Sequence, residues 1–200
     1  MQKAKVCVLV SGGGTNLQAI LDAEKSGIIK SAEISLVISN NYDAYALKRA
    51  ENAGIDNIVI SKKELGKELF EEKLIEEIEK HNIDIIVLAG FMCILSEKFT
   101  SRFPRKILNV HPALIPSFCG EGFYGLKVHE AALAKGVKVT GATVHFVNEI
   151  PDGGEIIAQK AVEVLPGDTP EVLQKRVMEQ AEWIILPLAV EKVAAEIINN

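Results

Sequence analysis

The sequence predicts an α/β fold: an open, mainly parallel twisted sheet flanked by helices, with antiparallel strands in its C-terminal part. Three observations carry this prediction. Short apolar runs alternate with segments of helical periodicity, one run is apolar throughout, and the pattern changes after Pro116. The 200 residues are 48% hydrophobic and 24% charged, which is typical of one domain with a well-buried core.

Five short apolar runs are predicted to be strands. They span residues 5–10, 34–39, 58–60, 84–89 and 106–110. Strands that are separated by helical segments normally pair in parallel, as in βαβ units. The fourth run lacks polar alternation, so we expect a central strand that is covered on both faces. The first part of the chain, about residues 1–105, is therefore predicted to form a Rossmann-like sheet.

Two helical segments are marked clearly by their residue pattern. Between the third and fourth runs, apolar residues recur every three or four positions with Glu and Lys between them, which predicts a surface helix. Its apolar positions are Leu65, Leu69, Phe70, Leu74, Ile75 and Ile78. A final helix should begin with Thr169 as its cap and Pro170 at its first position, and Pro187 should kink it. The residues expected to face inward are Val172, Leu173, Val177, Ile184, Ile185 and Leu188.

After Pro116 the pattern changes. Two longer, half-alternating runs at residues 138–147 and 155–164 flank a polar loop at 148–154. Such a pattern predicts two antiparallel strands. We therefore expect one domain of residues 1–200 whose C-terminal half, about residues 106–200, differs from its N-terminal half.

Composition and charge argue against several classes of protein. The formal net charge of −5 disfavours a general nucleic-acid surface, so an anionic ligand would be held by local groups. No apolar run approaches the length of a membrane span, and the first one begins too early for a signal peptide. The three cysteines form no Cys-x-x-Cys pair, and no two histidines have metal-ligand spacing. We expect a cytoplasmic protein with reduced thiols, no metal, and neither nucleic acid nor membrane as partner.

The end of the fifth run carries two chemically useful side chains. Asn109 and His111 are two residues apart, so in a strand they point to the same face. An amide can stabilise a developing oxyanion, and an imidazole can move a proton near neutral pH. The pair therefore suits attack on a carbonyl group. The alternative is an ordinary strand end with a hydrogen-bonded core histidine.

A glycine-rich segment, Ser-Gly-Gly-Gly-Thr-Asn at residues 11–16, directly follows the first run and opens a helix. Glycines at a helix N-terminus expose backbone N–H groups that can hold a phosphate. The expected anion-binding residues are Gly12, Gly13, Gly14, Thr15 and Asn16. The segment lacks the Gly-Lys-Ser/Thr of a Walker loop and the third glycine of the dinucleotide fingerprint, which argues against ATP and NAD. A tight turn with a Thr or Asn cap is the alternative.

Two further segments are candidates for the same site. After the fourth run, the chain carries large apolar side chains past Gly90, at the sheet edge where α/β proteins bind ligands, so an aromatic heterocycle could fit there. Buried core is the alternative for this segment. Asp152 precedes two glycines, and by itself this pattern indicates an ordinary turn.

Taken together and in order along nearly the whole chain, five segments resemble the folate-dependent phosphoribosylglycinamide formyltransferases of purine synthesis. The segments are residues 11–18, 88–95, 109–116, 141–147 and 152–154. The resemblance implies a formyltransferase fold over residues 1–200. It also implies transfer of the formyl group of 10-formyltetrahydrofolate to the amine of glycinamide ribonucleotide by a monomer or homodimer.

The resemblance also assigns roles to residues. Asn109, His111 and Asp152 match the catalytic set, and Gly14, Thr15 and Asn16 match the substrate-phosphate site in particular. Glu182 matches a Glu that contacts the substrate, although an apparent extra residue lies nearby. The residues that match the folate site are Phe91, Met92, Cys93, Ile94, Leu95 and Val147, with Lys67 where relatives carry an Arg. Lysine keeps the charge of arginine but loses its planar fork.

Three structural expectations follow from the resemblance. The loop at residues 117–127 is longer than in well-known members, and we expect its extra residues not to touch the catalytic set. Ile115-Pro116 is expected to be a cis peptide. Asp152 should face His111 and raise the pKa of the imidazole above the reference of about 6.5.

The sequence leaves other functions as alternatives, in related enzymes and in a binding module. A formyltetrahydrofolate deformylase has a similar Asn-His-Asp set, but usually carries an N-terminal regulatory domain and lacks this phosphate loop. A methionyl-tRNA formyltransferase would need an additional tRNA-binding domain, for which no sequence remains. A noncatalytic nucleotide- or folate-binding module would bind without turnover.

Overall fold

The computed structural model describes residues 2–199, and a seven-stranded sheet organises them. The strands are β1 (Ala4–Val10), β2 (Ala32–Ser39), β3 (Asn57–Val59), β4 (Ile85–Leu88), β5 (Ile107–His111), β6 (Val139–Phe146) and β7 (Ile156–Glu163). Their order across the sheet is β3-β2-β1-β4-β5-β6-β7. The first five pair in parallel, whereas β6 and β7 are antiparallel additions next to β5. The predicted α/β class is confirmed.

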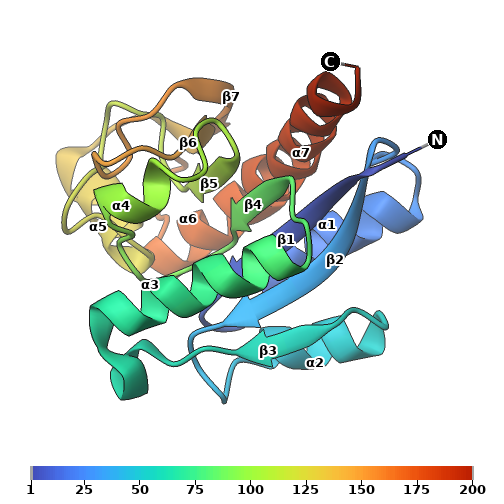
Figure 1. The fold of residues 1–200 in the computed structure, drawn as a ribbon. Helices are drawn as coiled ribbons and strands as arrows, with labels where there is room; N and C mark the ends of the chain where they lie inside the picture. Colours follow the sequence, from blue (N-terminus) through green and yellow to red (C-terminus); the bar gives the residue numbers. More distant parts are fainter. Residues whose placement is uncertain (1, 200) are drawn as a thin grey trace.

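Helices cover both faces of this sheet (Figure 1). They are α1 (Thr15–Lys25), α2 (Tyr45–Asn52), α3 (Lys62–Lys80), α4 (Glu97–Thr100), α5 (Leu126–Lys135), α6 (Pro170–Val177), a π-helical turn η1 (Met178–Glu182) and α7 (Trp183–Ile198). Side chains of α1, α2, α6 and α7 pack into one hydrophobic core, and those of α3 and α4 into a second. The two cores lie on opposite faces of the sheet.

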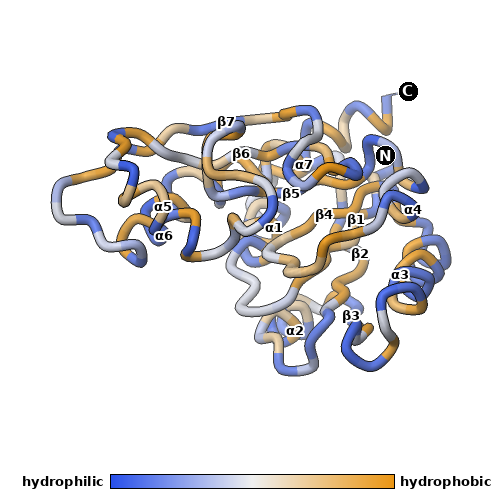
Figure 2. Tube along the Cα trace, turned by 90° about the vertical axis from the view of Figure 1, so that its left-hand side faces the viewer, coloured by the Kyte–Doolittle hydropathy of each residue, from blue (hydrophilic) through white to orange (hydrophobic). Residues whose placement is uncertain are grey.

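Strand β1 shows how the sequence fills both cores. Val6, Val8 and Val10 belong to the core on the α1 side, whereas Cys7 and Leu9 belong to the core on the α3 side. This division follows from the two-residue period of a strand. Apolar residues gather accordingly on the central strands, and hydrophilic residues on the outer helices and loops (Figure 2). The fourth run, now β4, is buried at all its positions, as predicted.

The final helix departs from the prediction in two respects. Thr169 does cap α6, since its hydroxyl accepts a hydrogen bond from the N–H of Val172 at 3.3 Å. However, three of the six residues expected to face inward are 42–51% exposed; they are Val172, Ile184 and Leu188. The helical geometry also changes before Pro187, in η1, where one turn holds more residues than an α-helical turn. This wider turn shifts the phase of the apolar stripe for Ile184 and Leu188, which follow it, and a constant helical period did not anticipate that shift; Val172 precedes the turn and is exposed in the first turn of α6.

Two local backbone features lie outside the regular strands and helices of the prediction: a cis peptide bond and a break within a helix. Ile115-Pro116 is a cis peptide, as expected. Helix α3 contains a break at Gly66, whose φ of 75° is left-handed, and this break was not predicted. Among the described residues no helix is long and apolar enough to cross a membrane.

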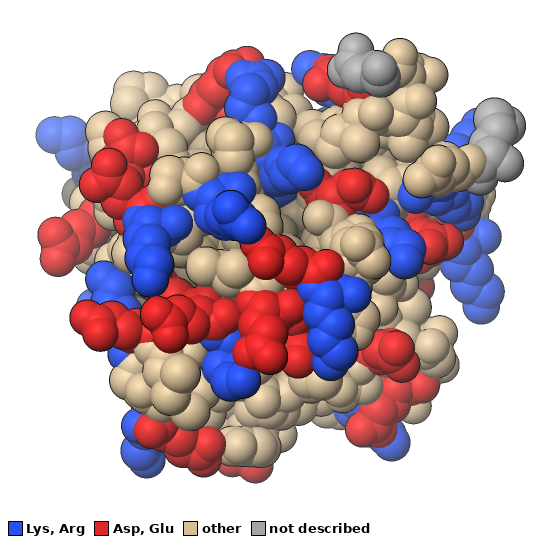
Figure 3. All heavy atoms as spheres, in the orientation of Figure 1, with Lys and Arg blue, Asp and Glu red and all other residues tan. Residues whose placement is uncertain are grey.

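Charges are intermingled on the face that carries α3 (Figure 3). Ion pairs there join Lys73 to Glu76 at 2.6 Å and Arg102 to Glu79 at 2.7 Å. Because opposite charges alternate on this face, it presents no broad positive field. An anionic ligand on this face would have to rely on local groups.

Candidate active site

The candidate site lies at the carboxyl edge of three neighbouring parallel strands. Strand β1 leads into the glycine loop at residues 11–16, β4 leads into the segment at 90–95, and β5 carries Asn109 and His111. One contact joins the first two of these segments, and another joins the second to Asn40 at the end of β2. The N–H of Met92 donates to the hydroxyl of Ser11 at 2.8 Å, and the Asn40 amide donates to the Cys93 sulfur at 3.0 Å. Parallel strands end at the same sheet edge, which is why these distant segments meet.

Asn109 and His111 share one face of β5, as predicted, because Leu108 and Val110 occupy the core on the other face. Antiparallel pairing places His145 of β6 directly beside Asn109. The Asn109 amide nitrogen lies 3.2 Å from His145 Nε2. His145 Nδ1 lies 2.8 Å from the Phe146 carbonyl oxygen and must therefore carry a hydrogen. In its neutral form, His145 thus accepts from Asn109.

Asp152 reaches this group from the loop between β6 and β7. Its Oδ2 lies 3.5 Å from His111 Nδ1, and its Oδ1 lies 3.5 Å from both His145 Nε2 and the Asn109 amide nitrogen. The backbone has a φ of 55° at this residue, in a turn closed by the N–H of Gly153 and the carbonyl of Ile150 at 2.9 Å. Asp152 is therefore a turn residue and also a member of the cluster.

The loop after Pro116 closes over the same side chains. His111 Nε2 lies 2.8 Å from the Phe118 carbonyl oxygen, and the N–H of Gly120 donates to Asp152 Oδ2 at 2.8 Å. The loop whose extra residues were expected not to touch the predicted Asn-His-Asp set thus contacts His111 and Asp152 through the backbone of Phe118 and Gly120. A loop's backbone groups need partners when they are buried, and here the side chains of His111 and Asp152 supply them. With this cover, His111 is 4% exposed, more enclosed than an open cleft would leave it.

The electrostatics of His111 differ from the expectation. Burial lowers the pKa of His111, and this effect outweighs the nearby charge of Asp152 and the Phe118 carbonyl, both of which raise it. The predicted net increase is therefore wrong, because desolvation of the imidazolium was not considered. Burial raises the pKa of Asp152, but the contact with His145, the hydrogen bond from the Gly120 N–H and the positive charge that either histidine carries when protonated lower it more. The cluster therefore favours an ionised carboxylate beside a neutral imidazole.

The glycine loop leads into the N-terminus of α1, a position where backbone N–H groups can hold an anion. Gly14 has a φ of 71°, and an added Cβ would lie 2.6 Å from the Cβ of Ala46, so no other residue fits there without distortion. Gly12 and Gly13 face open space instead, with no atom within 4 Å of an added Cβ. At the end of the loop, the amide of buried Asn16 donates to Glu182 Oε2 at 2.8 Å. Burial raises the pKa of Glu182.

The contact between Asn16 and Glu182 joins residues 166 positions apart. Glu182 is the last residue of η1, whose wider turn accommodates an additional residue in the helix. The structure thus brings Glu182 to the glycine loop despite the extra residue noted in the sequence. π-Helical turns often occur at functional sites.

The residues matched to the folate site fall into two groups. Met92 and Ile94 are 57% and 62% exposed, which is unusual for large apolar side chains and leaves them free to contact a ligand. Leu95 is buried, and Phe91, Cys93 and Val147 pack against the same core on the α3 side. Lys67 is exposed on α3 beside the break at Gly66.

His145 and Arg49 belong to this region but were not predicted. Only the register of β6 on β5 places His145 beside Asn109. Arg49 of α2 donates from Nε to the carbonyl of Gly13 at 2.8 Å. No local motif marks Arg49, whereas His145 lies in the segment 141–147 that carried the resemblance but was given no role there. A paired-strand model that aligned the two polar positions of β5 and β6 could have found His145.

His129 of α5 is fully buried, and neither ring nitrogen has a partner among the described residues. Burial, aided by the charge of His111, lowers its pKa to about 4. Folding therefore disfavours protonation of the His129 ring. The stability that depends on a neutral His129 is complete above about pH 6.5 and is lost as the pH falls to about 4. Over this range, the free energy of unfolding should fall less steeply with decreasing pH in His129→Leu than in the parent. The two slopes should differ by up to about 1.4 kcal/mol per pH unit. Urea unfolding at several pH values measures both slopes, and equal slopes would contradict the prediction.

Comparison with known proteins places the chain in a class. Residues 4–190 match the family described as formyl transferase, so the chain belongs to this family. It is 44% identical over 188 residues to phosphoribosylglycinamide formyltransferase of Haemophilus influenzae, covering 94% of this chain and 85% of the relative. The structure also resembles the crystal structure of glycinamide ribonucleotide transformylase 1 from Symbiobacterium toebii, with a TM-score of 0.90 and 40% sequence identity. The match covers 97% of this chain and 89% of that one.

Some relatives are much longer. The chain is 39% identical to the chloroplastic phosphoribosylglycinamide formyltransferase of Arabidopsis thaliana over 90% of its own length, but spans 62% of that protein. It spans 19% of the trifunctional purine biosynthetic protein adenosine-3 of Gallus gallus, at 45% identity over 96% of its own length. The same fold thus occurs both in proteins of similar length and within longer chains.

Proposed function

We propose that this chain is a phosphoribosylglycinamide formyltransferase, which transfers the formyl group of 10-formyltetrahydrofolate to the amine of glycinamide ribonucleotide in purine (IMP) biosynthesis. The observation that carries the proposal is the meeting of two features at one sheet edge. A glycine loop suited to a phosphate follows β1, and the Asn109, His111 and Asp152 cluster lies two strands away on β5 and its neighbouring loops. The family and its relatives support the same reaction.

In the proposed reaction, the neutral amine of the substrate attacks the formyl carbon of the folate. Gly12, Gly13, Gly14, Thr15, Asn16 and Glu182 would hold the nucleotide, and this anchoring reduces the entropic cost of bringing the reactants together. The Asn109 amide and His111 would stabilise the negative charge that develops on the formyl oxygen. That charge raises the affinity of a neighbouring imidazole for a proton, so a neutral His111 can accept one as the reaction proceeds.

The proton must then move from the substrate nitrogen to the folate nitrogen that leaves. His111 can carry it, or a water molecule held by Asp152 can do so. Protonation of His111 puts a hydrogen on Nδ1, which faces Asp152 at 3.5 Å, so the carboxylate stabilises the charged ring. No covalent intermediate with the enzyme is needed.

The proposed folate site uses Phe91, Met92, Cys93, Ile94, Leu95, Val147 and Lys67. Its exposed apolar side chains, Met92 and Ile94, fit the aromatic ring of a pterin, whereas the buried members shape the wall behind them. We further propose one domain, with the phosphate-binding half at about residues 1–105 and the catalytic and folate-binding half at about residues 106–200. A cytoplasmic location and a monomeric or homodimeric state are part of the same proposal.

The function is tested with purified protein, glycinamide ribonucleotide and 10-formyltetrahydrofolate, by following the formation of tetrahydrofolate and of formylated nucleotide. We expect both products in equal amounts. Release of formate without nucleotide would instead identify a deformylase, in which water replaces the amine. Binding of either compound without turnover would identify a noncatalytic module.

Substitution of Gly13 tests the phosphate site directly. An added Cβ at Gly13 meets no protein atom within 4 Å, so Gly13→Val should fold normally while its side chain obstructs the anion site. We expect the KM for glycinamide ribonucleotide to rise about 10-fold or more, as expected when a hydrogen bond to a charged group is lost. Ala53→Val is the control, because it adds an exposed side chain of the same kind at the C-terminal end of α2, where φ is −88°. Unchanged substrate affinity in Gly13→Val would contradict the assignment of the loop.

A further inference from the structure

Helix α2 fixes the direction of the peptide groups in the glycine loop. The N–H of Ala46 donates to the carbonyl of Gly12 at 3.0 Å, and Arg49 Nε donates to the carbonyl of Gly13 at 2.8 Å. In a trans peptide the carbonyl and the following N–H point in opposite directions. The N–H groups of Gly13 and Gly14 therefore point away from α2, and they donate to none of the described residues.

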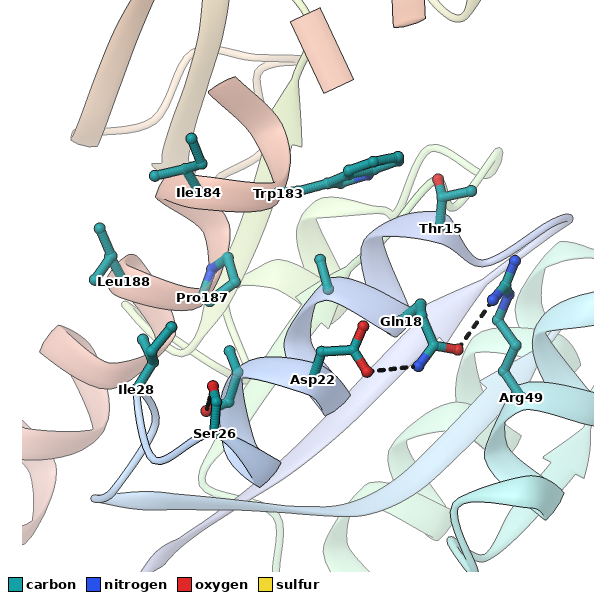
Figure 4. A pocket seen from close by; sticks show the side chains of 12 residues that line it. Thr15, Gln18, Asp22, Ser26, Ile28, Arg49, Trp183, Ile184, Pro187 and Leu188 are labelled. Atoms are coloured by element: carbon teal, nitrogen blue, oxygen red, sulfur yellow. Dashed lines mark hydrogen bonds between the residues drawn. The ribbon is translucent and has the colours of Figure 1, made fainter. Parts of the chain in front are cut away.

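Arg49 is itself held in place by side chains of α1 and α2 (Figure 4). Its Nη1 donates to Gln18 Oε1 at 2.9 Å, and Gln18 Nε2 donates to Asp22 Oδ1 at 2.9 Å. On the other side, its guanidinium carbon lies 5.0 Å from the centre of the Tyr45 ring. The guanidinium thus has fixed partners on both helices, while its Nη2 donates to none of the residues that the structure describes.

Arg49 also supplies a positive charge beside a loop that has none of its own. The protein carries a net charge of −5, and the glycine loop contains neither Lys nor Arg. Among residues 2–199, Arg49 is the only Lys or Arg whose side chain forms a hydrogen bond with this loop. A fixed guanidinium beside exposed N–H groups strengthens the attraction for an anion.

We propose that Arg49 is a positioning residue for the substrate phosphate: it orients the peptide groups of the glycine loop and places a positive charge beside them. This inference rests on the proposed function, because it concerns the affinity of the same loop for glycinamide ribonucleotide. It assigns to α2 a part in phosphate recognition, although no residue of α2 carries a recognisable motif.

The test compares Arg49→Met with the parent on two substrates, glycinamide ribonucleotide and its dephosphorylated form. Arg49→Met should raise the KM for the phosphorylated substrate about 10- to 100-fold, as for the loss of a charged hydrogen-bond partner. The kcat, the KM for 10-formyltetrahydrofolate and the kcat/KM for the dephosphorylated substrate should stay within about 3-fold of the parent. Arg49→Lys should recover part of the loss, because it keeps the charge but not the planar fork.

The control is Arg102→Met, which removes the same charge from an exposed ion pair with Glu79 on the α3 side. It should leave both substrates unaffected. An equal loss of kcat/KM for the phosphorylated and dephosphorylated substrates in Arg49→Met would overturn the proposal, as would no loss for either. If Arg49→Met fails to fold, Arg49→Lys decides: it should show a smaller loss confined to the phosphorylated substrate, and parental affinity for both substrates would overturn the proposal.

Calorimetric titration with glycinamide ribonucleotide separates this proposal from the proposed function. A parent protein that binds the nucleotide but does not transfer a formyl group would refute the function, and weaker binding by Arg49→Met would still support the role of Arg49. A parent protein that does not bind the nucleotide would refute both.

Discussion

Replacement of His111 with alanine should lower kcat for formyl transfer by about 10²- to 10⁴-fold, the usual loss for one positioned acid–base group. The His111 ring makes two contacts. It lies within hydrogen-bond distance of the Phe118 carbonyl in the covering loop, and it lies 3.5 Å from the Asp152 carboxylate. Its loss removes the proposed proton carrier and one of the two groups that would stabilise the oxyanion. Steady-state kinetics with both substrates measure the effect.

His111 is buried, so this variant needs a check on folding. His111→Gln retains much of the volume and an amide that can donate to the Phe118 carbonyl, but it cannot exchange a proton at neutral pH. We expect it to unfold at nearly the parental temperature and to be nearly as inactive as the alanine variant. His81→Ala, at the end of α3, is the control that should retain activity. Near-normal turnover in folded His111→Gln would exclude proton transfer by this residue, and unfolding of both variants would indicate a structural histidine.

Asp152→Asn should lower kcat by about 10²-fold or more and should have a smaller effect on substrate affinity. Asparagine tolerates the left-handed backbone of this turn, so the fold should persist. Because the carboxylate raises the pKa of His111 against the effect of burial, its removal should lower that pKa further. The imidazolium would then be harder to form at the step that needs it.

Kinetics and NMR titration of the His111 ring test the two parts of this prediction separately. Glu149→Gln is the matched control, since it removes an exposed carboxylate from the same loop. Unchanged turnover in Asp152→Asn would leave Asp152 as a turn residue only. Lost turnover with an unchanged pKa of His111 would instead assign its role to a bound water molecule.

The sequence by itself determined the fold class and most of the candidate site. Strand positions follow from apolar runs, and the two-residue period of β5 put Asn109 and His111 on one face. The glycine loop could be recognised because a strand, consecutive glycines and a helix follow one another directly in the chain. These features are local, so their physical causes lie within a few neighbouring residues.

Tertiary structure decided what depends on distant segments meeting. The antiparallel register of β6 brings His145 to Asn109, η1 brings Glu182 to Asn16, and packing of α2 brings Arg49 to Gly13. It also decided the pKa of His111, which is lowered because the covering loop removes water from the ring. Desolvation depends on everything that surrounds a group, and a sequence specifies that surrounding only through the complete fold.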